Sequence, residues 1–513
     1  MGTDRLRFST SDRDSQKAAA RAVRNRAERL DRELRVNFLP VGRAMSLAEA
    51  RDIETANWHA AGLPSPQEIA DTTPELRAHA KHEVARVLEA RLNAIHDLGD
   101  RLIRGSLAQL PHAVRSQWDG LAAIDATFVA ANCATPRKWS KKRADHERYL
   151  PVDPHAGWYI REGDPPRWGY EMSQIIAASS LTRGPVHDFP SLTLGYRLHV
   201  PGVDPGGAAV GGVDGAAKAG FSVRLLAGDR LYTSLKPENY ALPLHERGVD
   251  TVIDYKDSQL GLQAEYHGAI LVEGTWYSPS MPEVLRQATV DYRAKRIDYE
   301  TWRSRLTARR KYELAPHGKD RNGNPRYRCS AKDPNAQVQC PLSPSSLAYP
   351  LLPMVELPPM TDQTDVVHRI CEQVTMVIPR EVSGNFWQRL AYESEEWNDA
   401  FGPLRNRQEG RHGLQKRTDG DSLDDKHRRS FRGFVLASIT QGVLAATGNV
   451  HAINSFFEEA VATPERAYVV ARRTRKTKED WVDIRHFPRS KKRDQDDLHA
   501  VAATDAGESP PGD

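Results

Sequence analysis

The chain has little cysteine and no long uninterrupted hydrophobic run. Only four of its 513 residues are cysteine, too few for the disulfide framework of a secreted protein. Its least charged stretches, 334–355 and 433–457, are interrupted by prolines, serines or polar amides, which is not typical of a membrane-spanning helix. The N-terminal segment MGTDRLRFST is charged and lacks the apolar core of an export signal. We therefore expect a cytoplasmic protein with no membrane partner.

Two common enzyme signatures are also absent. The chain has neither the Gly-x-Ser-x-Gly turn of serine hydrolases nor the Gly-x4-Gly-Lys-Ser/Thr loop that binds nucleotide phosphates. Residues 202–220 are rich in glycine but lack the strand-to-helix context of a dinucleotide site, so we interpret them as a flexible connection. Serine hydrolase and ATPase chemistry therefore have no support in the sequence.

Charge is distributed unevenly along a rather polar chain. Hydrophobic residues make up 39% and charged residues 27%, and the net charge is +4; the length predicts two to four domains. Residues 466–493 hold eleven Lys and Arg against three acidic residues, and a second basic patch occupies 137–143. Such clusters suit a nucleic-acid backbone, because neutralised phosphates release condensed counterions. A solvated protein surface is the alternative interpretation.

The hydrophobic pattern changes from helical to mixed along the chain. Residues 14–112 are mainly helical in pattern, with an amphipathic stretch at 79–98. Short apolar runs typical of strands follow at 121–130, 169–179, 221–227 and 251–255, with a helix expected at 237–247. Turns, prolines and short strands dominate 258–379, around a helix-like stretch at 282–312. Helical patterns return at 404–417 and 431–446, and the polar end of the chain, 494–513, is typical of disorder.

Three acidic residues have positions that suit metal binding. Asp125 interrupts an apolar strand, where an unpaired carboxylate is costly to bury. Asp229 comes directly after a strand, where α/β folds commonly bind ligands. Glu409 lies in a helical segment with basic neighbours. Each of the two aspartates, taken alone, also fits a structural role as a cap or an ion-pair partner.

The residues spaced around Glu409 are more informative than its position alone. Arg405, Glu409 and Lys416 are four and then seven residues apart, which places them within about 40° of one another on one helical face. An Arg–Glu pair at this spacing commonly braces a helix. That structural role explains neither Lys416 on the same face nor the two distant aspartates.

These residues resemble the signature of insertion-sequence-four-type DDE transposases. The spacing Arg-x3-Glu-x6-Lys is similar to that family's Tyr-x2-Arg-x3-Glu-x6-Lys motif, and IDAT (124–127) and GDRLY (228–232) resemble the contexts of its two aspartates. The resemblance covers about Trp118 to Phe457. One departure is clear: the signature tyrosine is Gly402 here, with Phe401 one place early, and Pro403 predicts that the helix begins or kinks there.

The resemblance implies a fold and a division of the chain. The family's core is an RNase H-like mixed α/β sheet with flanking helices, in which the two aspartates lie on neighbouring strands and the glutamate on a helix packed against them. The gap from Asp229 to Glu409 is far longer than that fold needs, so we expect a partly β insertion domain within it. The expected units are an N-terminal helical domain that could bind DNA, two parts of the core with the insertion between them, and a basic, then disordered tail: 1–115, 116–257, 258–379, 380–465 and 466–513.

The resemblance also implies an activity. Asp125, Asp229 and Glu409 would be the catalytic residues and would hold Mg²⁺ or Mn²⁺, as two ions, because hard cations prefer carboxylate ligands. Arg405 and Lys416 would bind the phosphates of double-stranded DNA, both element ends and target, and a homo-oligomer would form on the DNA. Two alternatives stay open: a catalytically inactive or domesticated DNA-binding descendant, and an RNase H-like nuclease that never joins strands.

The expected insertion contains two further groups of interest. By resemblance, Trp276 is a candidate to hold an unpaired base, and a core tryptophan is the alternative. Cys329, Cys340, His368 and Cys371 have thiol and imidazole groups that can bind structural zinc. Their spacings are loose, so reduced, unpaired cysteines are the other interpretation.

Overall fold

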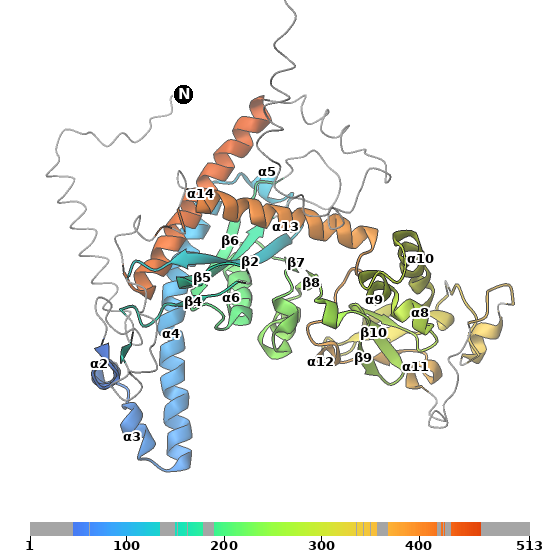
Figure 1. Cartoon of the computed structure of the whole chain (residues 1–513), viewed down its shortest axis with the longest axis horizontal. Helices are drawn as coiled ribbons and strands as arrows, with labels where there is room; N and C mark the ends of the chain where they lie inside the picture. The colour runs from blue at the N-terminus through green and yellow to red at the C-terminus, as the bar shows by residue number, and fades with distance from the viewer. Residues whose placement is uncertain are drawn as a thin grey trace, which may run out of the picture.

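The computed structural model describes residues 45–60, 62–133, 149–150, 152–161, 163–177, 189–334, 336–341, 343–348, 350–355, 368–417, 422–423, 425 and 432–462. The basic segments 137–143 and 466–493, residues 1–44 of the expected N-terminal helical domain, and the tail 494–513 lie outside this part of the chain. Within it, no helix combines the length and the apolar character needed to cross a membrane. The fold is mixed α/β, as the sequence predicts (Figure 1).

A mixed sheet forms the centre of the molecule. Its five main strands are ordered β6-β5-β2-β7-β8, and the short strand β4 pairs with the start of β5. Their bounds are β2 Leu121–Ala130, β4 Gly157–Tyr159, β5 Arg167–Ala177, β6 Thr193–His199, β7 Leu225–Gly228 and β8 Asp250–Ile253. Strands β2, β7 and β8 are parallel, whereas β5 is antiparallel to β2 and to β6. All four strands predicted from sequence are present: β2 has the predicted ends, and the ends of the other three are shifted.

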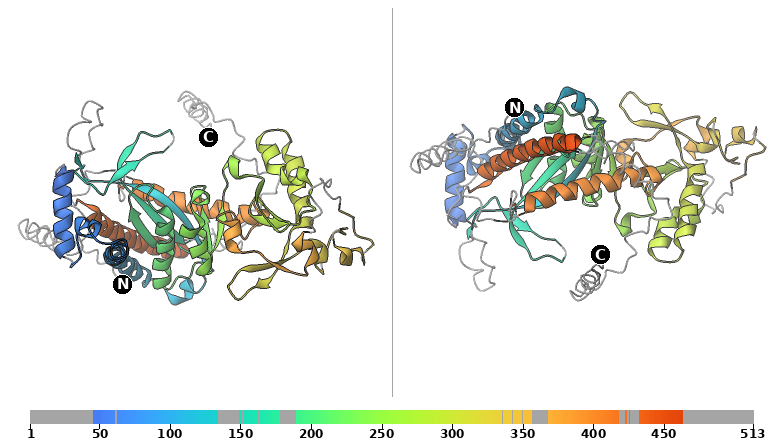
Figure 2. Two further views of the ribbon diagram at one scale, coloured as in Figure 1. Left: turned by 90° about the horizontal axis from the view of Figure 1, so that it is seen from below. Right: turned by 90° about the horizontal axis from the view of Figure 1, so that it is seen from above.

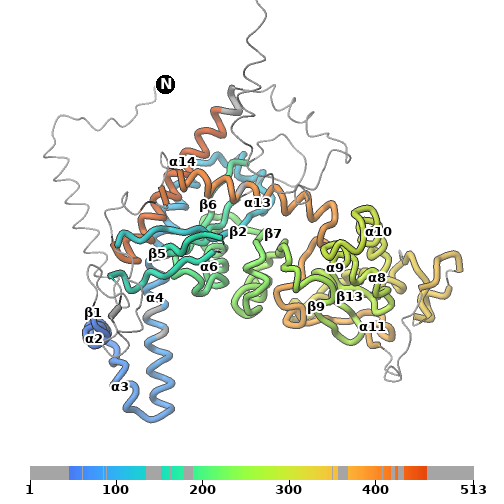
Figure 3. The backbone as a smooth tube through the Cα atoms, in the orientation of Figure 1, coloured from blue at the N-terminus to red at the C-terminus, as the bar shows by residue number. Residues whose placement is uncertain are grey.

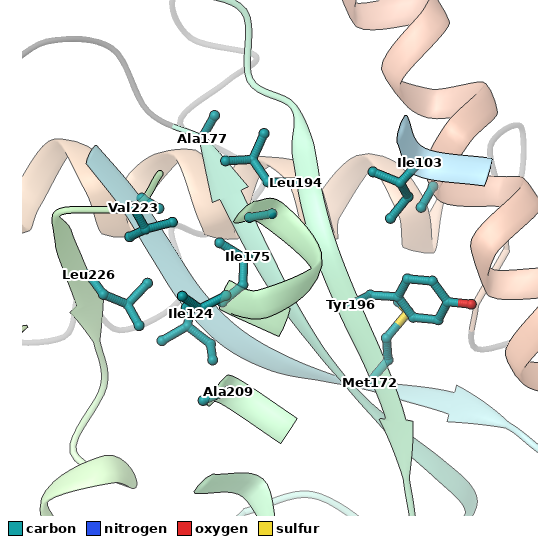
Figure 4. Close-up of a cluster of buried hydrophobic side chains, with 14 of the residues drawn as sticks. Ile103, Ile124, Met172, Ile175, Ala177, Leu194, Tyr196, Ala209, Val223 and Leu226 are labelled. Atoms are coloured by element: carbon teal, nitrogen blue, oxygen red, sulfur yellow. The ribbon is translucent and has the colours of Figure 1, made fainter. Parts of the chain in front are cut away.

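Helices cover both faces of this sheet. Helix α6 (Pro205–Lys218) packs on β5 and β6 from one side. Helix α13 (Glu395–Lys416) crosses β2, β7 and β8 on the opposite face, and α14 (Phe434–Ala462) lies beside it (Figures 1 and 2). The cluster drawn in Figure 4 joins these layers through side chains from β2, β5, β6, α4 and α6. The sheet is therefore buried on both sides, which explains the nearly continuous apolar run of β2.

The glycine-rich segment is a helix, so its interpretation as a flexible connection was wrong. Asp204 caps α6 by accepting a hydrogen bond from the Gly207 backbone N–H at 2.9 Å, and Pro205 occupies its first turn. The glycines allow close approach to the sheet: a Cβ at Gly212 would lie 2.9 Å from the Ile175 side chain. Close packing of α6 thus outweighs the poor helix propensity of glycine.

The N-terminal helices join the core through one long element. Helix α4 (Pro74–Leu107) packs its second half on α14 and β6. Its first half extends away from the sheet and packs against α2 (Leu47–Ala60) and α3 (Pro66–Ala70) in a small separate cluster that includes Trp58 and Ile69 (Figure 3). The helical character expected for this region is confirmed, and α4 belongs both to the N-terminal module and to the core.

The stretch between β8 and α13 contains two three-stranded sheets, so its partly β character is confirmed. The strand orders are β11-β10-β9 and β12-β13-β14. The strands are β9 Leu262–Tyr266, β10 Ala269–Val272, β11 Thr275–Tyr277, β12 Ala315–Lys319, β13 Pro325–Arg328 and β14 Met376–Val377. The helix expected at 282–312 is three shorter ones: α8 Glu283–Arg286, α9 Ala288–Arg293 and α10 Tyr299–Arg309. Figure 1 shows this insertion beside the core sheet, at the start of α13.

The remaining short elements connect these units. They are β1 Met45–Ser46, β3 Tyr149–Leu150, α5 His112–Arg115, α7 Ala241–Glu246, α11 Arg369–Glu372 and α12 Arg380–Ser383. Helix α7 connects β7 to β8 and corresponds to the second half of the helix expected at 237–247.

Helix α13 begins earlier than Pro403, which corrects the predicted start. Ser394 caps the helix by accepting a hydrogen bond from the Trp397 backbone N–H at 3.0 Å, and the helix begins at Glu395, eight residues before Pro403. Pro403 lies inside the helix and removes one backbone hydrogen bond. Trp397, Phe401 and Leu404 are buried against the sheet, and this apolar burial compensates for the lost bond.

Close packing between β6 and α6 gives a stability prediction. A Cβ at Gly195 would collide with the backbone carbonyl oxygen of Gly212, so Gly195→Ala should lower the free energy of unfolding by about 1–3 kcal/mol. The control, Gly413→Ala, adds a Cβ with no neighbour within 4 Å at an exposed position of α13. It should raise the free energy of unfolding by about 0.5–1 kcal/mol. Urea unfolding measures both; equal effects would contradict the packing of α6.

Candidate functional site

The two predicted aspartates lie side by side on neighbouring parallel strands. The register of β2 and β7 pairs Leu121 with Leu225 and Ala123 with Ala227. Continued by two residues, this offset aligns Asp125 with Asp229, directly after β7 ends. Strand β2 continues to Ala130, whereas β7 ends at Gly228. Both carboxylates therefore lie at the point where β2 no longer has β7 beside it. The charge of Asp125 also acts on Asp229, so the structure brings the two acids near each other.

The two carboxyl groups have opposite pKa shifts. Burial raises the pKa of Asp229 above its ordinary value, and the neighbouring carboxylate of Asp125 raises it further. Burial also acts to raise the pKa of Asp125, but His412, the Ala126 backbone N–H and the charge of Arg161 together outweigh it, so the net shift is downward. The site therefore holds one firmly ionised carboxylate and a second one whose charge is poorly compensated.

Helix α13 contributes the closest partner of Asp125. His412 Nδ1 lies 3.4 Å from Asp125 Oδ2, and the histidine side chain is only 7% exposed. Gln408, one turn earlier, places its Nε2 atom 3.1 Å from His412 Nε2. The sequence pattern predicted neither residue as part of a site. Their only signal was a spacing: His412 is three residues after Glu409, close to the same face of a helix.

Glu409 is on α13 as expected, but its side chain faces solvent. It accepts a hydrogen bond from Arg405 Nε at 2.9 Å, and the side chains are 56% and 52% exposed, respectively. Lys416, in the last turn, is half-buried. The described residues contain no group of three His, Cys, Asp or Glu side chains placed to hold one metal ion. The structure thus brings the two aspartates together and keeps Glu409 in a pair with Arg405.

A third aspartate also lies at this edge of the sheet. The register of β7 and β8 pairs Gly228 with Ile253, which aligns Asp229 with Asp254. Asp254 is buried and already bound: Arg230 Nε and Nη2 both lie 2.7 Å from its Oδ2, and Tyr392 donates a hydrogen bond to its Oδ1 at 2.6 Å. Its carboxylate is therefore a fixed anchor for Arg230, the residue that follows Asp229.

Two arginines act on the aspartate pair from different elements. Arg161, which follows β4, lowers the pKa of both Asp125 and Asp229 by its positive charge, as a minor contribution. Arg405 on α13 acts in the same way on Asp229. Both arginines are solvent-exposed. Positive side chains that face solvent beside a carboxylate pair can meet phosphate oxygens while the carboxylates hold a cation.

The candidates in the insertion are buried. Trp276 is 2% exposed in an apolar cluster, which supports the core interpretation over base stacking. Cys329, Cys340 and Cys371 belong to the same cluster. Burial raises the pKa of Cys371 to about 12, and the two other thiols add to this shift. A thiol with so high a pKa is protonated at neutral pH, consistent with reduced cysteines.

Comparison with known proteins identifies no relative. No family model matches the chain, and neither the curated proteins nor the solved structures contain a match. Any assignment of function therefore depends on the geometry of the site and on the sequence motif.

The raised pKa of Asp229 predicts the effect of removing its charge. Because folding raises this pKa, ionised Asp229 destabilises the fold at every pH above its folded pKa. This destabilisation decreases as the pH falls from the folded pKa toward the ordinary pKa of an aspartate. Asp229→Asn should therefore raise the thermal midpoint of the protein in EDTA at pH 7. Glu300→Gln, an exposed change on α10, is the control and should have little effect. A lower midpoint for Asp229→Asn would contradict the electrostatic description of the pair.

Proposed function

We propose that this chain is a DDE-type DNA transposase with an RNase H-like core, which cleaves DNA at element ends and joins it to a target. The observation that carries the proposal is the alignment of Asp125 with Asp229 on adjacent parallel strands. Two ionisable carboxylates placed together at a sheet edge create a negative site, and a divalent cation is the partner that relieves their repulsion.

The topology of the sheet supports an RNase H-like core. Three antiparallel strands, β2, β5 and β6, come first in the chain, and a helix then leads to β7 and β8, which are parallel to β2. The first acid lies on the central strand β2 and the second follows its neighbour β7. The insertion lies between β8 and α13. It therefore interrupts no strand of the central sheet, and the chain re-enters the core at the helix that carries Glu409.

Glu409 can serve as the third ligand if its side chain turns away from Arg405, and that change costs little energy. Its partner is Arg405, and an exposed ion pair four residues apart on a helix contributes only about 0.3–0.5 kcal/mol. Breaking that pair is a small cost beside the attraction of a divalent cation held by two carboxylates. The same change frees Arg405, whose charge already acts on Asp229.

The chain's own residues then have distinct roles. Asp125, Asp229 and Glu409 would hold Mg²⁺ or Mn²⁺, which when bound activates the attacking oxygen and stabilises the leaving one. Arg405 and Lys416 would orient the scissile phosphate by charge-assisted hydrogen bonds. Attack by water gives a nick, and attack by a free 3′-hydroxyl joins two strands. Binding of two element ends at once calls for a homo-oligomer on the DNA.

Cleavage assays test this function directly. With duplex DNA carrying the sequence that flanks the gene, and with Mg²⁺, Asp125→Asn, Asp229→Asn and Glu409→Gln should each lower the cleavage rate on the order of 10³-fold, because each removes a metal ligand worth several kcal/mol in the transition state. Asp399→Asn, on the exposed part of the same helix, is the matched control and should cleave normally.

The products separate the remaining possibilities. Strand joining from a pre-cut 3′ end supports a transposase, whereas cleavage without joining identifies a nuclease. DNA binding with no metal-dependent cleavage would show a non-catalytic protein and overturn the proposal. Normal cleavage by Glu409→Gln alone would remove that residue from the site and leave the aspartates.

A further inference from the structure

The orientation of the Asp125 carboxylate is fixed by two donors on different elements. Its Oδ1 atom accepts a hydrogen bond from the Ala126 backbone N–H at 2.8 Å. Its Oδ2 atom meets His412 Nδ1 at 3.4 Å. A carboxylate oxygen has two lone-pair positions, so each oxygen keeps one free for a metal ion. The two contacts therefore set the plane of the carboxylate without blocking it.

The contact with Asp125 defines which nitrogen of the His412 ring donates. An ionised carboxylate can only accept, so Nδ1, which faces Asp125 Oδ2, carries a proton, and Gln408 Nε2 lies 3.1 Å from Nε2 on the other side of the ring. Gln408 is 2% exposed and the His412 side chain 7% exposed. Water has little access to these two side chains, which strengthens the contact between them.

The helix couples this contact to the proposed third ligand. His412 follows Glu409 by three residues on α13, so the two side chains are about 60° apart around the helix axis. Seating His412 on Asp125 therefore fixes the rotation of α13 about its axis, and with it the direction in which Glu409 leaves the helix. The apolar residues Trp397, Phe401 and Leu404 hold the first half of the helix on the sheet, and His412 provides the corresponding contact in the second half.

We propose that His412, held by Gln408, is a positioning residue that orients Asp125 for divalent-cation binding. This inference rests on the proposed function, since it assumes that Asp125 is a metal ligand. Partners that hydrogen-bond a ligating carboxylate set its direction, and their loss typically weakens metal binding about 10–100-fold. Gln408 acts one step further out, by holding the imidazole ring at Nε2.

Two substitutions at residue 412 separate positioning from packing. His412→Leu keeps similar bulk and removes the donor, whereas His412→Asn keeps an N–H group near the position of Nδ1. Mn²⁺ binding to the full chain without DNA, followed by electron paramagnetic resonance, should weaken about 10–100-fold in His412→Leu and recover in His412→Asn. The Mg²⁺ concentration for half-maximal DNA cleavage should shift in parallel. His451→Leu, an exposed histidine on α14, is the control and should match wild type.

The outcomes distinguish failure of this inference from failure of the proposed function on which it rests. If wild type binds Mn²⁺, Asp125→Asn loses it and His412→Leu binds as wild type does, positioning by His412 is refuted and the metal site stands. If His412→Leu and His412→Asn weaken binding equally, with equally lowered thermal midpoints, the histidine only packs and the inference is overturned. If wild type neither binds Mn²⁺ nor cleaves DNA, the proposed function fails and the inference fails with it.

Discussion

The parallel register between β2 and β7 is the constraint on which the candidate site depends. It brings Asp125 and Asp229 together although they are far apart in the chain, and from Asp125 onward β2 no longer has β7 beside it. A shift of one residue would turn one of them to the other face of the sheet. Helix α6 connects the antiparallel strands to β7 and packs its glycines directly on β5 and β6.

Helix α13 has two halves with different functions. Its first half is an anchor, since aromatic and aliphatic side chains bury it against β2, β7 and β8. Its second half is polar on its inner side: Gln408, His412 and Gln415 are buried, while Glu409 faces solvent. Buried polar groups are costly unless they have partners, so the contact of His412 with Asp125 is both a structural need and an influence on the acid. The insertion joins the core at the anchored end.

Local pattern predicted the elements that carry the site, and tertiary contacts set the details. The run LAAIDATFVA identified β2 with its true ends, because a strand buried on both faces is apolar throughout. Glycine propensity gave the wrong answer at 205–218, where close packing decides, and proline gave the wrong start for α13, where a serine cap and apolar burial decide. The two aspartates were found from their places on strands. The pairing of Glu409 with Arg405, and the role of His412, depend on how α13 rotates over the sheet, which no spacing in the sequence specifies.

The central claim is that Asp125 and Asp229 together hold a divalent cation, and anomalous diffraction from crystals soaked in Mn²⁺ tests it most directly. The account predicts a manganese peak between the two carboxylates, about 2.0–2.2 Å from an oxygen of each, as expected for a small hard cation. A second ion, with Glu409 turned away from Arg405, would support the two-metal arrangement. No peak at the aspartate pair in saturating Mn²⁺, or a peak bound only elsewhere, would contradict the account.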